Sequence, residues 1–288
     1  MSASEVPEGI HYLLGHTEHE LRRLEIQGDL YRDETRKGFL AAGMERGMRV
    51  LDIGCGTGDV SRVAASVVGP TGSVLGIDRG LNAIQAATKL SRQKGVENTD
   101  FEVLEIEDLA ARVGDRGAGF DALVGRFILM HQPRPSAVLA VAAGSVRPGG
   151  IVCIVESHMD VLMKGAHSFP HSPLYHEIVD WKGRVVSGAG ADCYSGGRLR
   201  SVFVDAGLLD PKTHMHARLE GGPDSAYYEY IAHSVRCMLP EAARQGIGQY
   251  TEADADTLEQ RLRDEVVGSG GVLVAWPTVV AYARVRLS

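Results

Sequence analysis

The sequence predicts an α/β fold with a doubly wound sheet, and two features of its pattern carry this prediction. From residue 48 onward, short apolar runs rich in β-branched residues alternate with segments of helical period. This alternation is typical of a parallel sheet that helices cover on both faces. A glycine-rich turn also joins the first apolar run to the first helix, and such turns lie at the sheet edge where ligands bind.

The N-terminal half supplies most of the expected sheet. Leucines and isoleucines recur at roughly helical spacing over residues 10–43, so we expect a helical segment there. Five apolar runs follow, and we expect strands at 48–54, 72–80, 99–108, 119–129 and 150–157. Helices are expected between them at 60–69, 81–95 and 135–150, each of which closes with glycine.

The pattern loosens after residue 157. A helix at 197–208, a strand at 212–221, mostly helical sequence at 222–268 and a strand at 276–286 are expected there. We therefore expect an N-terminal helical lid (1–44), a core (45–157), a first lid insertion (158–195), a core helix and strand (196–221), a second helical insertion (222–270) and a C-terminal core strand (271–288).

Composition narrows the classes of partner. The 288 residues are 44% hydrophobic and carry a net charge of -7, which argues against nucleic acid as the main ligand. The sequence has no apolar run of about 18 residues, and its first residues do not combine a basic region with a long apolar one. We therefore expect no signal peptide, and a cytoplasmic monomer or homodimer away from membranes. Four cysteines, none in a CxxC pair, predict neither disulfides nor a metal site.

The glycine-rich turn, "LDIGCGTG", raises the question of which ligand it binds. Its glycines, Gly54, Gly56 and Gly58, stand on alternate positions, unlike the GxGxxG of dinucleotide-binding proteins. Asp52 ends the strand where a pyrophosphate would lie, and two anions repel one another at short range. We therefore expect a ligand with a cation, such as an amino group, near Asp52, which argues against a nicotinamide oxidoreductase.

A second acid, Asp78, ends the next strand in "GIDRG", 20 residues beyond Gly58. An acid at this spacing suits the two hydroxyls of an unphosphorylated ribose. The alternative is that Asp78 caps a helix. Together with Asp52, Asp78 predicts a ligand made of a nucleoside joined to an amino acid.

On these residues the chain resembles the class I S-adenosylmethionine-dependent methyltransferases. "VLDIGCGTG" corresponds to their first motif and "GIDRG" to their second, and the strand order over 48–286 is similar throughout. The resemblance implies a seven-stranded Rossmann-like sheet, S-adenosylmethionine as cofactor, and a glycine loop close to its methionine part. It further implies that Asp52 lies near the amino group, Asp78 binds the ribose and Arg79 lies beside the adenine.

The resemblance extends to two further segments. In "VLEIEDL", Glu105 and Ile106 correspond to positions that hold the adenine edge, although most relatives have Asp-Ala there. In "GRFILMHQP", Gly125 and Arg126 correspond to residues that run along the methionine carbons.

The N-terminal helix is similar to the lid segment of small-molecule methyltransferases of actinobacterial natural-product pathways. This similarity implies that Tyr12 and Gln27 close over the cofactor. The alternative is an amphipathic helix with a solvated polar face. A lid suits methyl transfer, which gains from the exclusion of water and from fixed geometry.

Methyl transfer requires a nucleophile held in line behind the methyl carbon, and a base only if the acceptor must lose a proton. Three candidates for that base or for acceptor binding follow the fourth and fifth strands: His131, Glu156 and His158. All three fall at strand ends, near the expected crevice. The alternative for His131 is a structural role in packing.

Aromatic residues make up only 6% of the chain and gather in the two insertions. Clustered there are His167, His171, Tyr175, His176, Trp181, Tyr227, Tyr228 and Tyr230. They favour a small, flat, aromatic acceptor, and the alternative is that they pack the lid onto the core.

Two segments, "YLLGHTEHELRRLEIQ" and "VESHMD", are similar to the indole C3-methyltransferases of actinobacterial alkaloid pathways. That similarity implies a secondary metabolite such as a tryptamine or a tryptophan diketopiperazine. Two alternatives stay open: O- or C-methylation of quinone or polyketide intermediates, and a protein that binds S-adenosylmethionine without transferring the methyl group.

Overall fold

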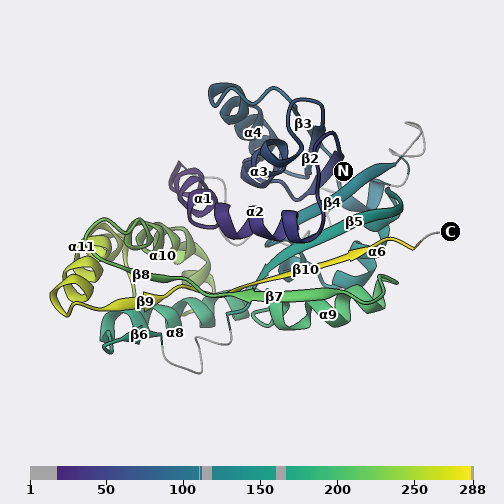
Figure 1. The fold of residues 1–288 in the computed structure, drawn as a ribbon. Helices are drawn as coiled ribbons and strands as arrows, with labels where there is room; N and C mark the ends of the chain where they lie inside the picture. The colour runs from purple at the N-terminus through teal and green to yellow at the C-terminus, as the bar shows by residue number, and fades with distance from the viewer. Residues whose placement is uncertain (1–17, 110, 112–118, 160–166, 287–288) are drawn as a thin grey trace, which may run out of the picture.

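The computed structural model describes residues 18–109, 111, 119–159 and 167–286. Its main sheet has seven strands: β1 (Arg49–Ile53), β2 (Ser73–Asp78), β3 (Thr99–Val103), β4 (Phe120–Arg126), β5 (Val146–Ser157), β7 (Lys212–His216) and β10 (Thr278–Arg284). They follow the order β3-β2-β1-β4-β5-β10-β7 (Figure 1). The strands from β3 to β5 are parallel, and β10 is antiparallel to both of its neighbours. The predicted doubly wound α/β sheet is therefore confirmed.

Helices cover both faces of this sheet. One face carries α2 (Arg32–Ala41), α3 (Asp59–Val68) and α4 (Leu81–Gln93), and the other carries α6 (Pro135–Ala143) and α9 (Ser195–Asp205). Alternation along the strands explains the two layers, because Val50 and Leu51 are neighbours in β1 and belong to different apolar clusters. In α3, the buried Val60, Val63 and Val67 recur at helical spacing and face the sheet.

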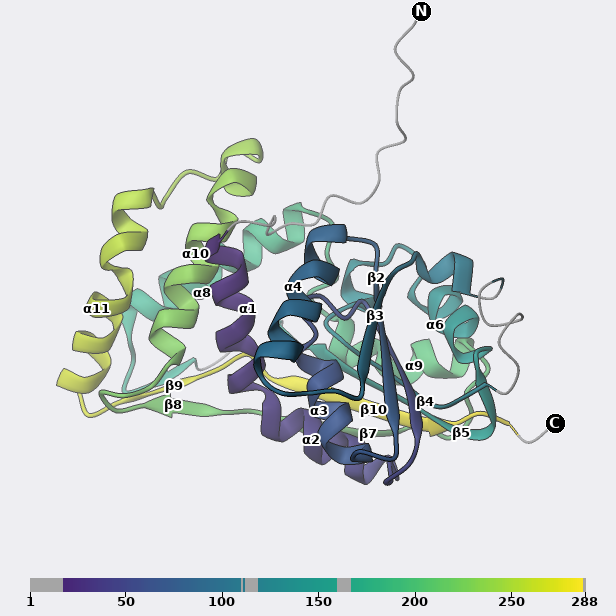
Figure 2. The ribbon, with the colours of Figure 1, turned by 90° about the horizontal axis from the view of Figure 1, so that it is seen from above.

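A second layer of structure lies beside the core, and we call it the lid. It contains α1 (Glu18–Leu30), α8 (Pro173–Gly188), α10 (Tyr227–Arg244), α11 (Glu252–Gly268), β6 (Ser168–Phe169), β8 (Leu219–Gly221) and β9 (Val272–Val274). The three strands form their own sheet, in the order β6-β9-β8. Figures 1 and 2 show α8, α10 and α11 to one side of the core, with α1 between them and α3. The lid has a separate apolar cluster of its own.

Two neighbouring stretches of chain connect the core and the lid, and we call this pair of connections the ribbon. β7 leads through residues 217–218 into β8, and β9 leads through residues 275–277 into β10 (Figure 1). The N–H of Ala275 donates to the carbonyl oxygen of Arg218 at 3.0 Å, so the hydrogen bonding continues between the two sheets. The sequence analysis assigned residues 219–221 and 272–274 to the core, whereas the structure pairs them in the lid sheet.

Several expected boundaries differ from the structure. The helical segment expected over 10–43 forms two helices within the described residues, which meet at Tyr31. The helix expected to reach residue 150 ends at Ala143, and Gly149, with φ of 75°, lies inside β5, where the strand shifts its register against β4. The strand expected over 99–108 ends at Val103. Within the described part of the chain, no helix is long and apolar enough to cross a membrane.

Candidate active site

The glycine loop between β1 and α3 adopts a backbone that only glycine accepts readily. Gly54, Gly56 and Gly58 have φ values of 62°, 52° and 76°. A Cβ atom on Gly54 would lie 2.5 Å from Ile128, and one on Gly58 would lie 2.8 Å from Phe101. A Cβ atom on Gly56 would meet no described atom within 4 Å. The outer glycines therefore permit close packing, while Gly56 borders open space where a ligand can approach the backbone.

The carboxylate of Asp78 holds this loop in place. One oxygen accepts the N–H of Gly56 at 3.0 Å, and the other accepts the N–H of Gly80 at 2.8 Å. The side chain is half-buried, and each oxygen retains a lone pair that can accept another hydrogen bond. This geometry is compatible with both interpretations of Asp78, capping of a helix and binding of a ribose. The carboxylate stabilises backbone N–H groups and still presents acceptors at the edge of the sheet where a ligand is expected.

Asp52 lies beneath the loop and not on its surface. The side chain is fully buried, Ser61 donates its hydroxyl to Oδ2 at 2.6 Å, and Oδ1 has no hydrogen-bond partner among the described residues. Burial raises the pKa of the Asp52 carboxyl to about 8. The expectation of a negative charge presented directly to a ligand amino group is therefore wrong for the ligand-free protein, because burial disfavours the ionised form.

This burial gives a pH prediction. The folded pKa of Asp52 exceeds its ordinary value, so the folded state binds more protons, and stability is lost as the pH rises from about 4 to about 8. Asp52→Asn removes this loss. We expect the free energy of unfolding of the wild type to fall relative to the variant over this range, measured by urea denaturation. Ser61→Ala keeps the carboxyl and should keep the trend, and a pH-independent difference would contradict the prediction.

Gly125 and Arg126 end β4 next to the loop. A Cβ atom on Gly125 would lie 3.0 Å from Ile53, so a side chain at this position would require its neighbours to shift. The guanidinium of Arg126 is buried, pairs with Asp59 and donates to the hydroxyl of Thr35 at 3.1 Å. The Arg126 side chain therefore joins β4 to α2 and α3, and the expected position of Gly125 and Arg126 along the methionine carbons of the cofactor stays a prediction.

The expected adenine residues follow neighbouring strands. Arg79 comes directly after β2 and is exposed, and the exposed Glu105 opens a 3₁₀ turn whose first residue, Ile106, is buried. β2 and β3 are parallel, and Asp78 pairs with Val103, so all of these residues lie at one edge of the sheet. The structure thus brings the expected cofactor residues together, and their contacts with a ligand stay a prediction. Tyr12 lies outside the described residues.

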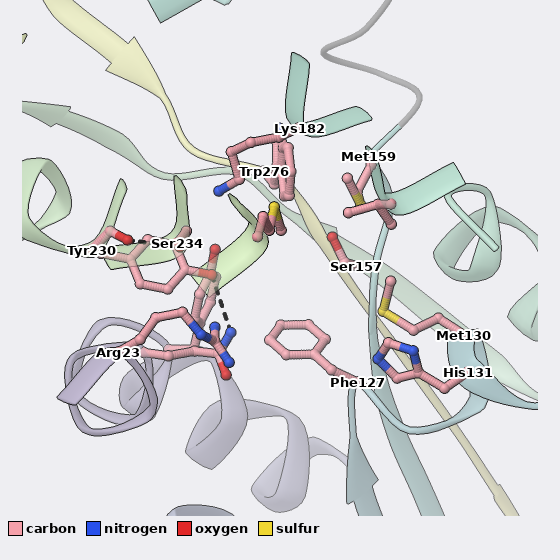
Figure 3. Close-up of a pocket in the computed structure, with 14 residues that line it drawn as sticks. Arg23, Phe127, Met130, His131, Ser157, Met159, Lys182, Tyr230, Ser234 and Trp276 are labelled. Atoms are coloured by element: carbon pink, nitrogen blue, oxygen red, sulfur yellow. Dashed lines mark hydrogen bonds between the residues drawn. The ribbon is translucent and has the colours of Figure 1, made fainter. Parts of the chain in front are cut away.

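A cavity lies between the core and the lid (Figure 3). It holds about 640 Å³ of empty space, part of which is open to solvent. Its walls come from the strand ends of the core and from α1, α8 and α10 of the lid, and they comprise Arg23, Gln27, Tyr31, Phe127, Met130, His131, Ser157, Met159, Lys182, Val186, Tyr230, Ser234, Met238 and Trp276. Apolar and aromatic walls with a few polar groups are typical of a site for a small aromatic molecule.

Of the three candidate bases, His131 alone is found in the wall of this cavity. It ends a 3₁₀ turn, Leu129–His131, that follows β4. Burial lowers the pKa of its imidazole to about 4, and the positive charges of Arg23 and Arg79 act in the same direction. His131 is therefore neutral at neutral pH, with one ring nitrogen able to accept a hydrogen bond.

Glu156 and His158 do not face the cavity. Glu156 is fully buried, and its Oε1 accepts the backbone N–H groups of Ile128 and Leu129 at 2.9 and 2.6 Å. His158 lies over the first turn of α9, where its Nδ1 accepts the N–H of Gly197 at 3.2 Å. Both residues were expected on the acceptor side. Their positions instead make Glu156 a positioning residue for the turn that carries His131, and His158 a contact between β5 and α9.

Gln27 lines the cavity and connects two of its walls, and its closure over the cofactor stays a prediction. Its Nε2 donates to the hydroxyl of Tyr230 at 3.1 Å, which joins α1 to α10 across the cavity wall. A close approach at Gly28 makes this placement possible, because a Cβ atom there would lie 2.9 Å from the Asp59 side chain in α3. Helix α1 therefore sits directly against the start of α3, beside the glycine loop.

Most of the aromatic residues singled out in the insertions pack the lid. Tyr175, Trp181, Tyr227 and Tyr228 are fully buried, and the hydroxyl oxygens of Tyr175 and Tyr227 lie 2.9 Å apart. From that group, Tyr230 reaches the cavity. The alternative that these residues attach and stabilise the lid is therefore correct for most of them.

The sequence analysis missed five residues of the cavity wall that carry charge or an aromatic ring: Arg23, Tyr31, Phe127, Lys182 and Trp276. Phe127 has φ of 56°, a conformation that costs a non-glycine residue about 1–3 kcal/mol and often marks a functional position. It lies between Arg23 and His131 in Figure 3.

Comparison with known proteins gives a family match. The family model for a methyltransferase domain matches residues 44–207. The chain is 34% identical over 116 residues to the ubiquinone biosynthesis O-methyltransferase of Xanthomonas axonopodis pv. citri, which is 40% of this chain and 46% of that protein. It is 31% identical over 133 residues to the demethylmenaquinone methyltransferase of Lactococcus lactis, 46% of this chain and 50% of that one. The chain spans about half the length of these curated relatives.

Solved structures share the fold at lower identity. The YcgJ protein of Bacillus subtilis superposes with a TM-score of 0.54 at 18% identity, over 94% of this chain and 100% of that one. The phosphoethanolamine N-methyltransferase 2 of Haemonchus contortus, in complex with S-adenosylmethionine, superposes with a TM-score of 0.51 at 15% identity. The superposition covers 88% of this chain and 53% of that one.

Proposed function

The chain belongs to the methyltransferase domain family, and from this premise we propose that it transfers the methyl group of S-adenosylmethionine to a hydroxyl oxygen of a small aromatic molecule. The observation that carries the proposal is the position of the cavity. It opens at the carboxyl ends of β4 and β5, next to the glycine loop, and aromatic side chains line it. A cofactor on the loop and an acceptor in the cavity would then be neighbours.

The residues at the loop fit this cofactor. Gly56 leaves its backbone open to a ligand, and Asp78 offers two carboxylate oxygens at the sheet edge. When bound, S-adenosylmethionine supplies a methyl group on a positively charged sulfur, and the carbon–sulfur bond breaks toward sulfur as an acceptor atom bonds to the carbon. The protein's part is to position the acceptor and exclude water, which the walls formed by Phe127, Tyr31 and α1 would do.

Two observations favour oxygen as the methylated atom. The cavity wall offers polar groups that can orient a hydroxyl, namely His131, Ser157 and Lys182. The relatives matched at 34% and 40% identity include ubiquinone biosynthesis O-methyltransferases. Methylation of indole carbon 3 remains a second candidate from the sequence analysis, and the flat side chains of Trp276 and Phe127 would suit an indole ring as well as a phenol.

Calorimetry and a panel of acceptors test this proposal together. We expect the protein to bind S-adenosylmethionine and to add one methyl group, seen by mass spectrometry, to phenolic or hydroquinone acceptors. Methylated tryptamine or tryptophan diketopiperazine in the same panel would move the assignment to indole carbon. Binding without transfer to any acceptor would overturn the proposal, as would the absence of cofactor binding.

His131 gives a specific prediction for this function. His131→Phe keeps a flat ring but removes the hydrogen-bond acceptor, and we expect kcat/KM for the acceptor to fall about tenfold, the cost of one lost hydrogen bond. The affinity for S-adenosylmethionine should stay nearly unchanged in calorimetry. His158→Phe is the matched control, because His158 lies outside the cavity wall, and it should keep the turnover of the wild type. Equal losses in both variants would contradict the assignment of His131.

A further inference from the structure

Lys182 is a buried lysine whose side chain points into the acceptor cavity. It lies on α8 and is 1% exposed. Its Nζ atom lies 4.4 Å from the ring centroid of Trp276 and 5.4 Å from that of Tyr230. Figure 3 shows Lys182 and Trp276 on the side of the cavity away from Phe127 and His131. An acceptor in the cavity would therefore lie between the amine and the core.

The charge of this amine is poorly compensated. Among the residues that the structure describes, no carboxylate forms an ion pair with Lys182, and aromatic faces are its recorded partners. Arg23, whose charge acts on Lys182, is itself bound through its guanidinium to both carboxylate oxygens of Glu20, at 2.7 and 2.8 Å. Burial, helped by the positive charge of Arg23, lowers the pKa of Lys182 to about 7, whereas Cys237 acts weakly in the opposite direction. In its protonated form this amine is a buried cation, and a buried cation normally has an anionic partner.

We propose that this partner is the acceptor itself: Lys182 binds the oxygen of an acidic hydroxyl, phenolic or enolic, on the substrate. This inference rests on the proposed methyl transfer and narrows its substrate class to acceptors that ionise readily. The proton passes from the hydroxyl to the neutral amine as the acceptor binds, and it leaves to water after the oxygen has been methylated. The resulting oxyanion and ammonium form a desolvated pair beside the face of Trp276, where their attraction is strong.

An acceptor with an acidic hydroxyl explains the buried amine of Lys182, which an acceptor that cannot ionise leaves unexplained. A neutral ether or hydrocarbon would leave the protonated amine without an anionic partner at a position that is only 1% exposed to solvent. His131 does not supply the missing negative charge, because an imidazole is either neutral or positively charged, and burial keeps this one neutral at neutral pH. An amine with a pKa near neutrality is also a better proton acceptor at neutral pH than an ordinary lysine, which is already protonated there.

The test uses two probes of nearly the same shape, 4-nitrophenol and its methyl ether 4-nitroanisole. Binding is measured at neutral pH on the full chain with S-adenosylhomocysteine bound, so that no methyl group can be transferred. We expect the wild type to bind nitrophenol at least about tenfold more tightly than nitroanisole. The visible absorbance of the bound nitrophenol should be that of the phenolate at a pH where the free compound is partly protonated.

Variants separate this role from a structural one. Lys182→Met should lose the preference for nitrophenol and the phenolate spectrum while keeping its melting temperature, because an apolar residue of similar length replaces a buried charge at little cost. Lys182→Arg keeps the charge and should keep the preference. Lys37→Met, at an exposed position of α2, is the matched control and should behave like the wild type.

Each outcome has a defined meaning. Equal binding of the two probes by the wild type, binding of neither, or an unchanged preference in Lys182→Met overturns the inference about Lys182. Failure of S-adenosylhomocysteine to bind the wild type instead overturns the proposed function. The two failures are therefore distinguishable in one set of measurements.

Discussion

Replacing Asp78 by alanine is expected to weaken the binding of S-adenosylmethionine by about 1–3 kcal/mol, the range for losing hydrogen bonds to a charged group. Asp78 accepts the N–H groups of Gly56 and Gly80, so the variant loses the group that fixes the glycine loop together with the expected partner of the ribose. Isothermal titration calorimetry measures the loss directly.

Two further variants sharpen this experiment. Asp78→Asn keeps the shape but turns one acceptor into a donor that faces a backbone N–H, so its loss should approach that of alanine. Asp100→Ala removes an exposed carboxyl from the neighbouring strand β3 and should change the affinity by less than about 0.5 kcal/mol. Unchanged affinity in Asp78→Ala would show that the ribose lies elsewhere.

Replacing Glu20 by alanine is expected to lower the free energy of unfolding by about 3–5 kcal/mol. Glu20 and Arg23 are 1% and 3% exposed and form a bidentate pair on α1, next to the cavity. Breaking the pair leaves the buried Arg23 guanidinium without this carboxylate, so the pair no longer offsets the cost of desolvating that charge. Urea denaturation followed by circular dichroism gives the measurement.

The control for this prediction is an exposed pair on the same helix. Glu25→Ala removes the carboxylate that lies 3.7 Å from Arg22, and we expect a loss below about 1 kcal/mol, as for other surface pairs. A double variant, Glu20→Leu with Arg23→Met, removes both buried charges and should recover most of the lost stability. A loss in Glu20→Ala no larger than that in Glu25→Ala would contradict the prediction.

The sequence predicted the fold and the cofactor because both depend on short, local patterns. Alternating strands and helices define the sheet, and positive φ at Gly54, Gly56 and Gly58 is a property of the loop itself. The argument from Asp52 reached the right cofactor by a step that the structure revises. A strand-end carboxylate looks accessible in the sequence, but alternation along β1 turns this one under the loop, toward Ser61.

The acceptor site was harder to predict, because its walls come from segments far apart in the chain. Glu156 and His158 end β5 at the expected edge, yet a strand end alone does not say which way a side chain points. Lys182 and Trp276 meet at 4.4 Å across 94 residues of sequence, and no pattern in either segment records that contact. Residues of this kind are found from tertiary structure alone.

The ribbon that links β7 and β10 to β8 and β9 limits how the two halves of the molecule can be displaced. Paired antiparallel strands resist sliding, because a shift along their length breaks the ladder of hydrogen bonds. The ribbon passes from one sheet to the other at residues 217–218 and 275–277, so we expect any bending between the two halves to occur there. Trp276 lies within that short connection and in the cavity wall. A rotation of one half against the other therefore pivots about the residue that stacks on Lys182, and the width of the acceptor cavity and the environment of its buried amine change together.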